Sequence, residues 1–544
     1  MREGLRQSMA WLHTWSGLLV CWVLFLVFGA GTASYFKEEI TLWMKPELHR
    51  AAQQPASTGQ QAQIAVNYMG KHAAQAPRWF ISLPADRSSE LSGGYVVPPS
   101  AADKAAGKRG KFKSDTIDTV TGEKAADVRE TRGGEFLYRL HYDLHYMPVL
   151  WARWIVGICA MFMLVAIISG VITHKRIFKD FFTFRSGKGQ RSWLDAHNAT
   201  AVLALPYHLM ITYTGLVTLM FMYMPSAAQM AYKGDEKAFF SDVFPGNSSN
   251  TKPAGVKAPL TAMAPLVAQA EQHWGGTRAA RLVVNHPGDA NATVVITRQR
   301  GAELSYLQPS MQFNGVTGEL LATNGDQIAP AAQTRGALYG LHMAHFAQPL
   351  LRVLFFLCGL AGCAMVATGA LLWAVKERQG HAKVLAKGGR VGFGLRLVDG
   401  LNIGAIAGLP IAFAAYFWAN RLLPIVLEKR AEAEITCFFA AWGVAAVLAQ
   451  LRPDRRMWQW QLRAGALLFI GLPVLNVFTT SSHLGVTLLQ GRGPWAVAGF
   501  DLTVLALGLF LAAAARKVGR KARSKSGAAA VAVRKHAEPQ KEAA

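Results

Sequence analysis

The chain has 544 residues, of which 51% are hydrophobic, and a formal net charge of +24. This composition is typical of a polytopic membrane protein and argues against a large soluble enzyme. The basic residues cluster in short segments between apolar runs, as the positive-inside rule expects, and no nucleic-acid-binding motif accompanies them. The five cysteines lie in apolar runs without a CxxC pattern, which argues against a disulfide framework, a zinc site and covalently attached haem.

The first predicted element is an apolar run, Met9 to Tyr35, which is long enough to span a bilayer. It is too long for a signal peptide and lacks a cleavage pattern, so residues 1–36 are predicted to form transmembrane helix 1. Its basic start puts the N-terminus in the cytoplasm and His13 near the cytoplasmic surface.

Residues 37–146 form a polar segment that is predicted to be periplasmic. The compositions of Ala51–Gln63 and Pro98–Lys113 favour loops. RWFISLP, GGYVVPP and DTVTGEKA favour short strands, the last leading into a turn.

Helices 2 and 3 are predicted within residues 147–224, on either side of a strongly basic cytoplasmic loop. Helix 2 covers about 147–173 and is followed by His174 at the cytoplasmic edge. Two histidines precede it, His141 and His145, and their spacing of four places them on one face, one turn apart.

Helix 3 is predicted over about 193–224 and carries His197 and His208 in an otherwise apolar stretch. In a single helix, these side chains lie within about 20° of one face and about 16 Å apart along the axis. Ionisable residues inside a membrane are costly and usually functional, and two imidazoles at two depths suit two haem irons. The simpler alternative is one interfacial histidine and one hydrogen-bonded core histidine.

A second polar segment, residues 225–337, has an α+β pattern like the first and is also predicted to be periplasmic. APLTAMAPLVAQAEQHW favours a helix, and ARLVVNHP, ATVVITRQR and LSYLQPSMQFNGVTGELL favour strands. Residues 338–378 are predicted to form helix 4, with His342 and His345 at its periplasmic start.

Four additional transmembrane helices are predicted in residues 395–515, followed by a basic, disordered cytoplasmic tail at 516–544. Eight spans with both termini in the cytoplasm fit the charge pattern. The sparse charges of these helices are predicted to lie mostly at span ends, which argues against a proton pathway. These charges are Asp399, Glu428, Glu432, Glu434 and Asp501.

The first four helices are predicted to be an internal duplication. LYRLHYDLH matches LYGLHMAHF and so aligns His141 with His342, whereas His13 and His197 open helices 1 and 3. The pair SG in helix 2 corresponds to TG in helix 4. A pseudo-two-fold axis along the membrane normal would bring equivalent histidines toward one another.

The histidines fall into two groups by predicted depth. The inner group is His13, His174 and His197; the outer group is His141, His208 and His342, with His145 and His345 as secondary candidates. A b-type haem needs an apolar slot with one imidazole on each side, so the grouping predicts two haems b with these histidines as iron ligands. Interfacial polar residues are the alternative. No GxGxxG or Walker motif is recognisable and no catalytic residue is predicted, so reducing equivalents come from elsewhere.

The pairing of ligands is predicted from depth and symmetry. Two of His13, His174 and His197 are expected to bind the inner haem, and His174 is favoured because it breaks the symmetry of the repeat. For the outer haem, His208 is expected opposite His342, with His141 as the repeat-related alternative.

Six motifs together resemble a known family. They are WLHTWSG, LHYDL, SGVITHKRIFKDFFTFR, LDAHNATAVLALPYHLMITYTG, LHMAHF and ATGALLWAVKER, and they extend from about Met1 to Arg378. The chain resembles the PepSY-associated transmembrane proteins, which include ferric-siderophore reductases of bacterial inner membranes. The resemblance implies a mainly α polytopic helical bundle with a di-haem four-helix core and two periplasmic PepSY-like α+β domains, residues 37–146 and 225–337. The helices from Leu395 onward depart from this pattern.

The resemblance also implies a function. We expect an inner-membrane oxidoreductase that passes electrons through haem b to a periplasmic ferric chelate such as siderophore-bound iron. The expected donor is a cytoplasmic reductant or the quinone pool. One alternative is a membrane sensor whose PepSY-like segments bind a peptide or protease, and another is a transporter that uses helices 5 to 8.

Overall fold

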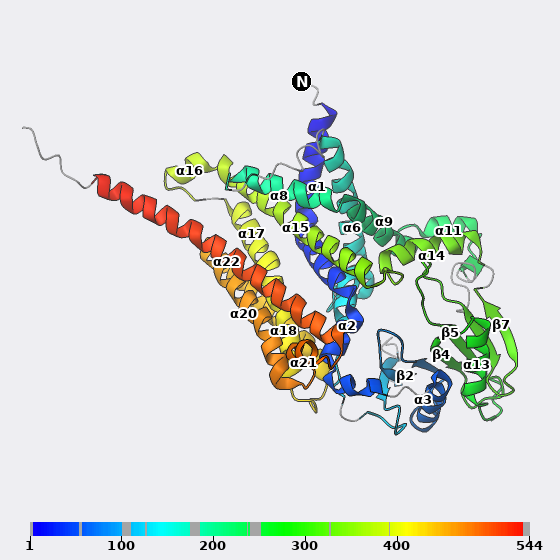
Figure 1. Ribbon diagram of the computed structural model, residues 1–544. Coiled ribbons are helices and arrows are strands. Elements are labelled where there is room, and N and C mark those ends of the chain that lie inside the picture. The colour runs from blue at the N-terminus through cyan, green and yellow to red at the C-terminus, as the bar shows by residue number, and fades with distance from the viewer. Residues whose placement is uncertain are drawn as a thin grey trace, which may run out of the picture. The chain divides into compact units, whose positions relative to one another are not determined.

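The computed structural model shows a mainly helical, multi-pass membrane protein that also contains a β-sheet (Figure 1). The structure describes residues 4–53, 57–100, 110–125, 128–174, 185, 187–236, 238–239, 252–325, 328–390 and 392–536. The chain divides into two compact units. The first unit is Met1–Pro46, Glu130–Leu209 and Phe355–Ala544, and the second is Glu47–Arg129 and Met210–Leu354.

The first unit consists of helices. Those of its N-terminal part are α1 (Leu5–Ser34), α2 (Lys37–Met44), α5 (Gly133–Asp143), α6 (Val149–Thr173), α8 (Gln190–Leu203), α15 (Pro349–Gly380) and α16 (Ala382–Ala386). α1, α6 and α15 are long and apolar enough to cross a bilayer, as predicted for helices 1, 2 and 4. Most of the basic segment that follows α6, residues 175–184 and 186, lies outside the described residues.

The predicted third span is bent. α8 is followed by α9 (Leu205–Thr218), and the two helices meet at 68°. Pro206 lies in the first turn of α9, where it has no N–H to continue the hydrogen-bond ladder of α8. The prediction that His197 and His208 share one face of a single helix is therefore wrong, because they lie on two different helices.

The C-terminal part of the first unit contains the four additional helices that the sequence predicts. They are α17 (Phe393–Asn402) continued through a π-helical turn (Ile403–Ala407) into α18 (Gly408–Leu422), then α19 (Arg430–Leu451), α20 (Arg455–Thr479) and α22 (Trp495–His536), with a short α21 (Leu484–Gln490). Within the described residues, seven helices could each cross a membrane, and the bent α8–α9 pair makes eight if it counts as one span. α22 continues through part of the tail that was predicted to be disordered.

These helices contain buried polar groups, some within one helix and some between helices. Arg430 and Glu434 form an ion pair within α19, and both side chains are fully buried. The carboxylate of Asp501 on α22 accepts hydrogen bonds from Trp43 Nε1 and Asn476 Nδ2, each at 2.9 Å. Glu434 and Asp501 lie in the second turns of α19 and α22, near the span ends where the sequence predicts these charges, and both are 0% exposed.

The second unit is built around one seven-stranded antiparallel sheet with the order β3-β2-β1-β4-β5-β6-β7. Its strands are β1 (Arg78–Ser82), β2 (Leu91–Val97), β3 (Lys111–Ile117), β4 (Ala279–Asn285), β5 (Thr293–Arg298), β6 (Ser310–Asn314) and β7 (Leu320–Asn324). Strands β1 and β4 join the two polar segments, with Trp79 opposite Val284 and Ile81 opposite Leu282. The sequence predicts two separate α+β domains, whereas the structure shows that the two segments share one sheet.

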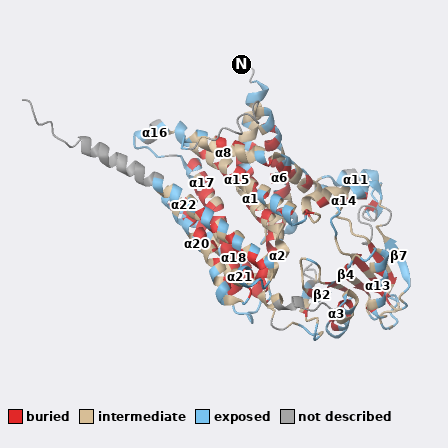
Figure 2. Ribbon diagram, viewed as in Figure 1, coloured by how far each residue is buried: buried red, intermediate tan, exposed pale blue. Residues whose placement is uncertain are grey.

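Two helices cover one face of this sheet. α3 (Thr58–His72) and α13 (Met263–His273) bury alternate strand residues, as the period of a strand requires (Figure 2). α3 starts inside the predicted loop Ala51–Gln63, because Ser57 and Gln60 form a capping box there. The remaining helices of this part are η1 (Pro46–Gln53), α10 (Met220–Tyr223), α11 (Pro225–Ala231) and α14 (Pro330–Met343).

Candidate functional site

Helices α1, α6, α8 and α15 and the start of α9 line an open cavity of about 380 Å³ within the first unit. Most of its wall is apolar and comes from residues such as Leu18, Leu24, Met163, Ile167 and Val366. Four of the predicted site histidines also line it, namely His13, His174, His197 and His208. The volume lies within the usual range for sites that take small molecules and cofactors.

His13 on α1 and His197 on α8 face each other across this cavity. Their ring centroids are 6.1 Å apart, with an angle of 63° between the ring planes. Nδ1 of His13 is 2.8 Å from the carbonyl oxygen of Ala166, and Nδ1 of His197 is 2.9 Å from that of Met365. Since a carbonyl oxygen only accepts, each Nδ1 carries the proton and each Nε2 keeps a free lone pair.

A glycine makes room for each of these two rings. A Cβ atom at Gly170 of α6 would lie 3.0 Å from Cε1 of His13, and one at Gly369 of α15 would lie 3.1 Å from Cε1 of His197. In both cases the carbonyl that binds Nδ1 belongs to the residue four positions before the glycine. A ring on one helix is thus seated against a carbonyl and a glycine of a second helix, and we call this arrangement a histidine seat.

Two imidazoles with free Nε2 atoms can bind one metal ion from opposite sides. With metal–nitrogen bonds of about 2 Å, the ring centroids of such a pair would be roughly 6 Å apart. Among the described residues, no group of three or more His, Cys, Asp or Glu side chains is arranged to hold a metal. Two neutral imidazoles on the wall of an apolar cavity are the donor set that a b-type haem requires.

His208 on α9 lines the same cavity and is 0% exposed. Neither of its ring nitrogens has a hydrogen-bond partner among the described residues, although the backbone of Ala201 and Cys358 lies close to the ring. Buried polar atoms without a partner are rare and call for an explanation such as a ligand. The ring packs edge-on against Phe28, with centroids 6.0 Å apart.

His174 lies at the end of α6, where the sequence places it, and its predicted role as a ligand of the inner haem stays a prediction. His174 is the C-cap of α6 and lines the cavity together with Lys376 and Gln190. The two rings that face each other are those of His13 and His197. The structure thus brings together the two repeat-related histidines of the inner group.

His141 on α5 forms another histidine seat in the first unit. Its Nδ1 is 2.7 Å from the carbonyl oxygen of Val27 on α1. A Cβ atom at Gly31, four residues after Val27, would lie 2.7 Å from the ring. The local arrangement is therefore the same as for His13 and His197.

His342 lies at the end of α14 in the second unit. Its Nδ1 is 3.2 Å from the hydroxyl oxygen of Thr214 on α9, and a Cβ atom at Gly215 would lie 3.0 Å from its Cε1. Because His342 and His208 belong to different units, their predicted pairing stays a prediction.

The two secondary candidates have other contacts. Nε2 of His145 lies 4.0 Å from a carboxylate oxygen of Glu432, and its ring stacks on Phe439. Nε2 of His345 accepts a hydrogen bond from Arg300 at 3.1 Å. Neither residue forms a histidine seat.

The four-helix region that carries these seats coincides with a family match. The family model of the PepSY-associated TM region matches residues 10–376. The chain belongs to the PepSY-associated TM family. The family match includes His13, His141, His197 and His342, and it ends before α17, so the four additional helices lie outside it.

The chain is also similar in sequence to a protein of Pseudomonas aeruginosa. The uncharacterized protein PA4219 of Pseudomonas aeruginosa is 27% identical over 373 residues, which cover 66% of this PepSY-associated TM protein and 89% of the relative. Its name assigns no activity.

Sequence reasoning found the histidines of this site and missed the glycines that seat them. The signal was present, because SG in helix 2 and TG in helix 4 contain Gly170 and Gly369 and are among the matched positions of the repeat. Gly31 and Gly215 are the corresponding glycines for His141 and His342.

Proposed function

We propose that this protein is an inner-membrane oxidoreductase that carries electrons through haem b to a periplasmic ferric chelate. The observation that carries the proposal is the pair His13 and His197, whose rings face each other in an apolar cavity with both Nε2 atoms free. The family membership supports a shared four-helix region but names no activity.

In this proposal His13 and His197 are the residues that would hold the iron of the inner haem. The carbonyls of Ala166 and Met365 fix the tautomer and the orientation of the two rings, which ligating histidines generally require. The bound haem would supply a one-electron carrier. The apolar wall would surround the macrocycle, and Lys376 and His174 are the basic groups of the lining that would suit the haem carboxylates. We therefore assign His174 to the edge of the haem.

The outer haem is proposed to use histidines of the outer group. His141 occupies a histidine seat against α1, and in the second unit the ring of His342 lies against Thr214 and Gly215. His208 is the other candidate, because it is buried with both ring nitrogens unpartnered. The haem content of single variants of His141, His208 and His342 would show which of these residues hold the outer haem.

The direction of electron transfer, from the cytoplasm to the periplasm, follows from the proposed topology. The basic segments and both termini are assigned to the cytoplasm, and the sheet unit is assigned to the periplasm. The donor is a cytoplasmic reductant or the quinone pool. The acceptor gains one electron, and its Fe(III) becomes Fe(II), which chelators made for Fe(III) hold less tightly.

The first experiment measures cofactor content. Purified protein is expected to give a pyridine-haemochrome spectrum of haem b with about two haems per chain, and His13→Ala and His197→Ala are each expected to lose the inner haem. His174→Ala should keep a low-spin spectrum, and His273→Ala, in the sheet unit, serves as a matched control. Purified protein without haem would overturn the proposal and favour the sensor that binds a peptide or protease.

The second experiment measures the reaction. Protein in liposomes receives a reductant on one side and a ferric siderophore with a Fe(II) trap on the other. The intact protein is expected to produce trapped Fe(II), and His208→Ala is expected to lower the rate by orders of magnitude if His208 binds the outer haem. Wild-type haem content and rate in His208→Ala would remove this residue from the relay.

A further inference from the structure

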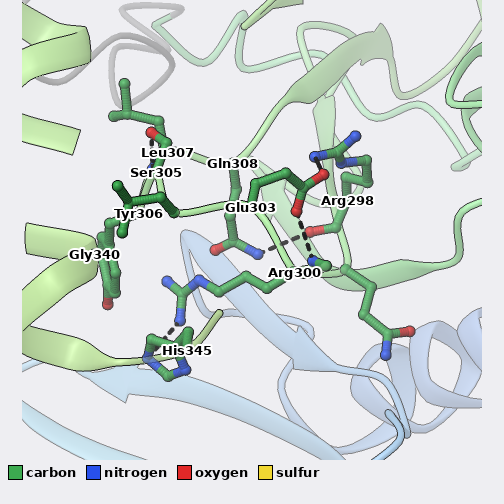
Figure 3. Close-up of a pocket in the computed structure, with 12 residues that line it drawn as sticks. Arg298, Arg300, Glu303, Ser305, Tyr306, Leu307, Gln308, Gly340 and His345 are labelled. Atoms are coloured by element: carbon green, nitrogen blue, oxygen red, sulfur yellow. Dashed lines mark hydrogen bonds and ion pairs between the residues drawn. The ribbon is translucent and has the colours of Figure 1, made fainter. Parts of the chain in front are cut away.

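The second unit contains a small recess where the chain between β5 and β6 crosses the end of α14 (Figure 3). Its lining includes Arg298, Arg300, Tyr306 and His345. The enclosed space is about 10 Å³, which is room for one oxygen-sized group, and the recess opens toward solvent beyond it.

Arg300 is the central cation of this recess. Its guanidinium donates to Nε2 of His345 at 3.1 Å and stacks over the ring of Tyr306 at 4.0 Å (Figure 3). Because arginine stays protonated, His345 can accept this bond only as a neutral imidazole. Nε of Arg300 is buried and has no hydrogen-bond partner among the described residues.

Positive charge exceeds negative charge around the recess. Glu303 is bound by Arg298 at 2.6 Å, so its charge is already paired. Among the described residues, no carboxylate lies within ion-pair distance of Arg300 or the neighbouring Arg281. Desolvation and then the charge of Arg300 lower the pKa of Arg281, which is the effect expected where cations are crowded.

The two halves of the internal repeat differ at the positions next to this recess. In the first half, Asp143 follows the equivalent histidine and binds Arg153 at 2.8 Å. The matching residue of the second half is Ala344, which carries no charge. Arg139 of the first half likewise corresponds to Gly340, whose missing side chain lets the carbonyl of Leu304 lie directly against α14.

We propose that this recess binds a carboxylate arm of an anionic ferric chelate, with Arg300 as the main contact. The inference rests on the proposed function and narrows its substrate to polycarboxylate chelates. An arginine fork matches the planar geometry of a carboxylate, and a stacked guanidinium is already oriented for it. Gly340 and His345 of the recess lie on either side of His342 in the chain, so a chelate bound there would be held close to a proposed haem ligand.

The test measures binding without electron transfer. Ga(III) citrate has the same coordination chemistry as the ferric complex and is not reduced, so equilibrium dialysis against the purified full-length protein reports binding alone. Arg300→Gln is expected to weaken binding at least tenfold, and Arg300→Lys, which keeps the charge, should recover part of it. Arg139→Gln, at the position that corresponds to Gly340, is the matched control and should bind as the wild type does.

Two outcomes would overturn the proposal: absence of saturable binding to the wild type, or equal binding by wild type and Arg300→Gln. A neutral trihydroxamate complex of Ga(III) should bind equally to both proteins, and a parallel loss there would also overturn it, because it would indicate a general structural defect. Failure of the proposed function is distinguishable, since it would appear as missing haem or missing reduction of every chelate while citrate binding still depended on Arg300.

Discussion

At the scale of single residues, the histidine seat determines which nitrogen of the ring is held by the protein and which is left over. A carbonyl oxygen holds Nδ1 and a glycine four residues later gives the ring space, so Nε2 is the nitrogen left for a ligand. The device is built from backbone atoms of a neighbouring helix. The histidine seat therefore depends on the distance between the two helices. Replacing the glycine by alanine, which adds one methyl group, tests whether the ring needs this space.

Gly31→Ala is expected to displace His141, because the new Cβ would lie 2.7 Å from the ring. A real Cβ contact is not this short, so the imidazole has to move and lose its bond to Val27. The measurement is haem content and the optical spectrum, with one haem expected to be lost or converted to high spin. Gly29→Ala is the matched control on the same helix, since its Cβ would meet its nearest neighbour at an ordinary 3.7 Å. Equal spectra for both variants would contradict the seat.

The residue types of the site could be predicted from the sequence, whereas their pairing could not. Histidines in apolar runs are visible because they are costly there. Whether His174 or His13 faces His197 depends on which carbonyl accepts each Nδ1, and that contact joins residues more than 150 positions apart. The repeat relates His13 to His197, and these are the two rings that lie 6.1 Å apart.

At the scale of elements, the bend between α8 and α9 separates two histidines that the sequence places on one helix. The 68° angle means that the directions of His197 and His208 are set independently. A hydrophobic run of the right length identifies a span but contains no information on its straightness. Pro206 was the available signal, because proline tends to end a helix before it.

Pro206→Ala is expected to restore an N–H that can bond back into α8 and so weaken the bend. Because the bend positions His208 in the cavity, we expect lower haem retention during purification and a shifted optical spectrum. Pro349→Ala is the control, since Pro349 begins α15 and no helix continues through it. An unchanged spectrum in Pro206→Ala would show that packing alone holds the two helices apart.

At the scale of the whole chain, buried ion pairs and long-range strand pairing determine which elements pack together, and local sequence patterns do not predict this. Strand β1 pairs with β4 across about two hundred residues, so local alternation predicts each strand without its neighbour. In the additional helices, Glu434 receives a bond from Asn420 at 2.8 Å and another from Thr131 just before α5 at 2.5 Å. These helices are thereby fixed to the family region through buried charge.

Glu434→Ala is expected to destabilise the protein by about 3–5 kcal/mol, because it leaves Arg430 buried without its counter-charge. Thermal unfolding in detergent is the measurement. Glu432→Ala is the matched control two residues earlier, where the carboxylate is exposed and 3.5 Å from Arg132. Such a surface pair contributes about 1 kcal/mol or less. Similar losses for both variants would mean that the buried pair has no special role.

The acceptors of the ring hydrogen bonds differ in a way that bears on reduction potential. The rings of His13, His197 and His141 donate to peptide carbonyls. Nδ1 of His342 instead lies against the hydroxyl of Thr214, which itself donates to the carbonyl of Met210 at 2.7 Å. A carbonyl is the stronger acceptor and gives the imidazole more anionic character, which favours an oxidised metal. An optical redox titration should then find the site that contains His342 at the higher potential. Electron transfer from the proposed haem site at His13 and His197 to the proposed site at His342 would then be favourable. The direction of transfer would be set by the two potentials and would need no conformational change.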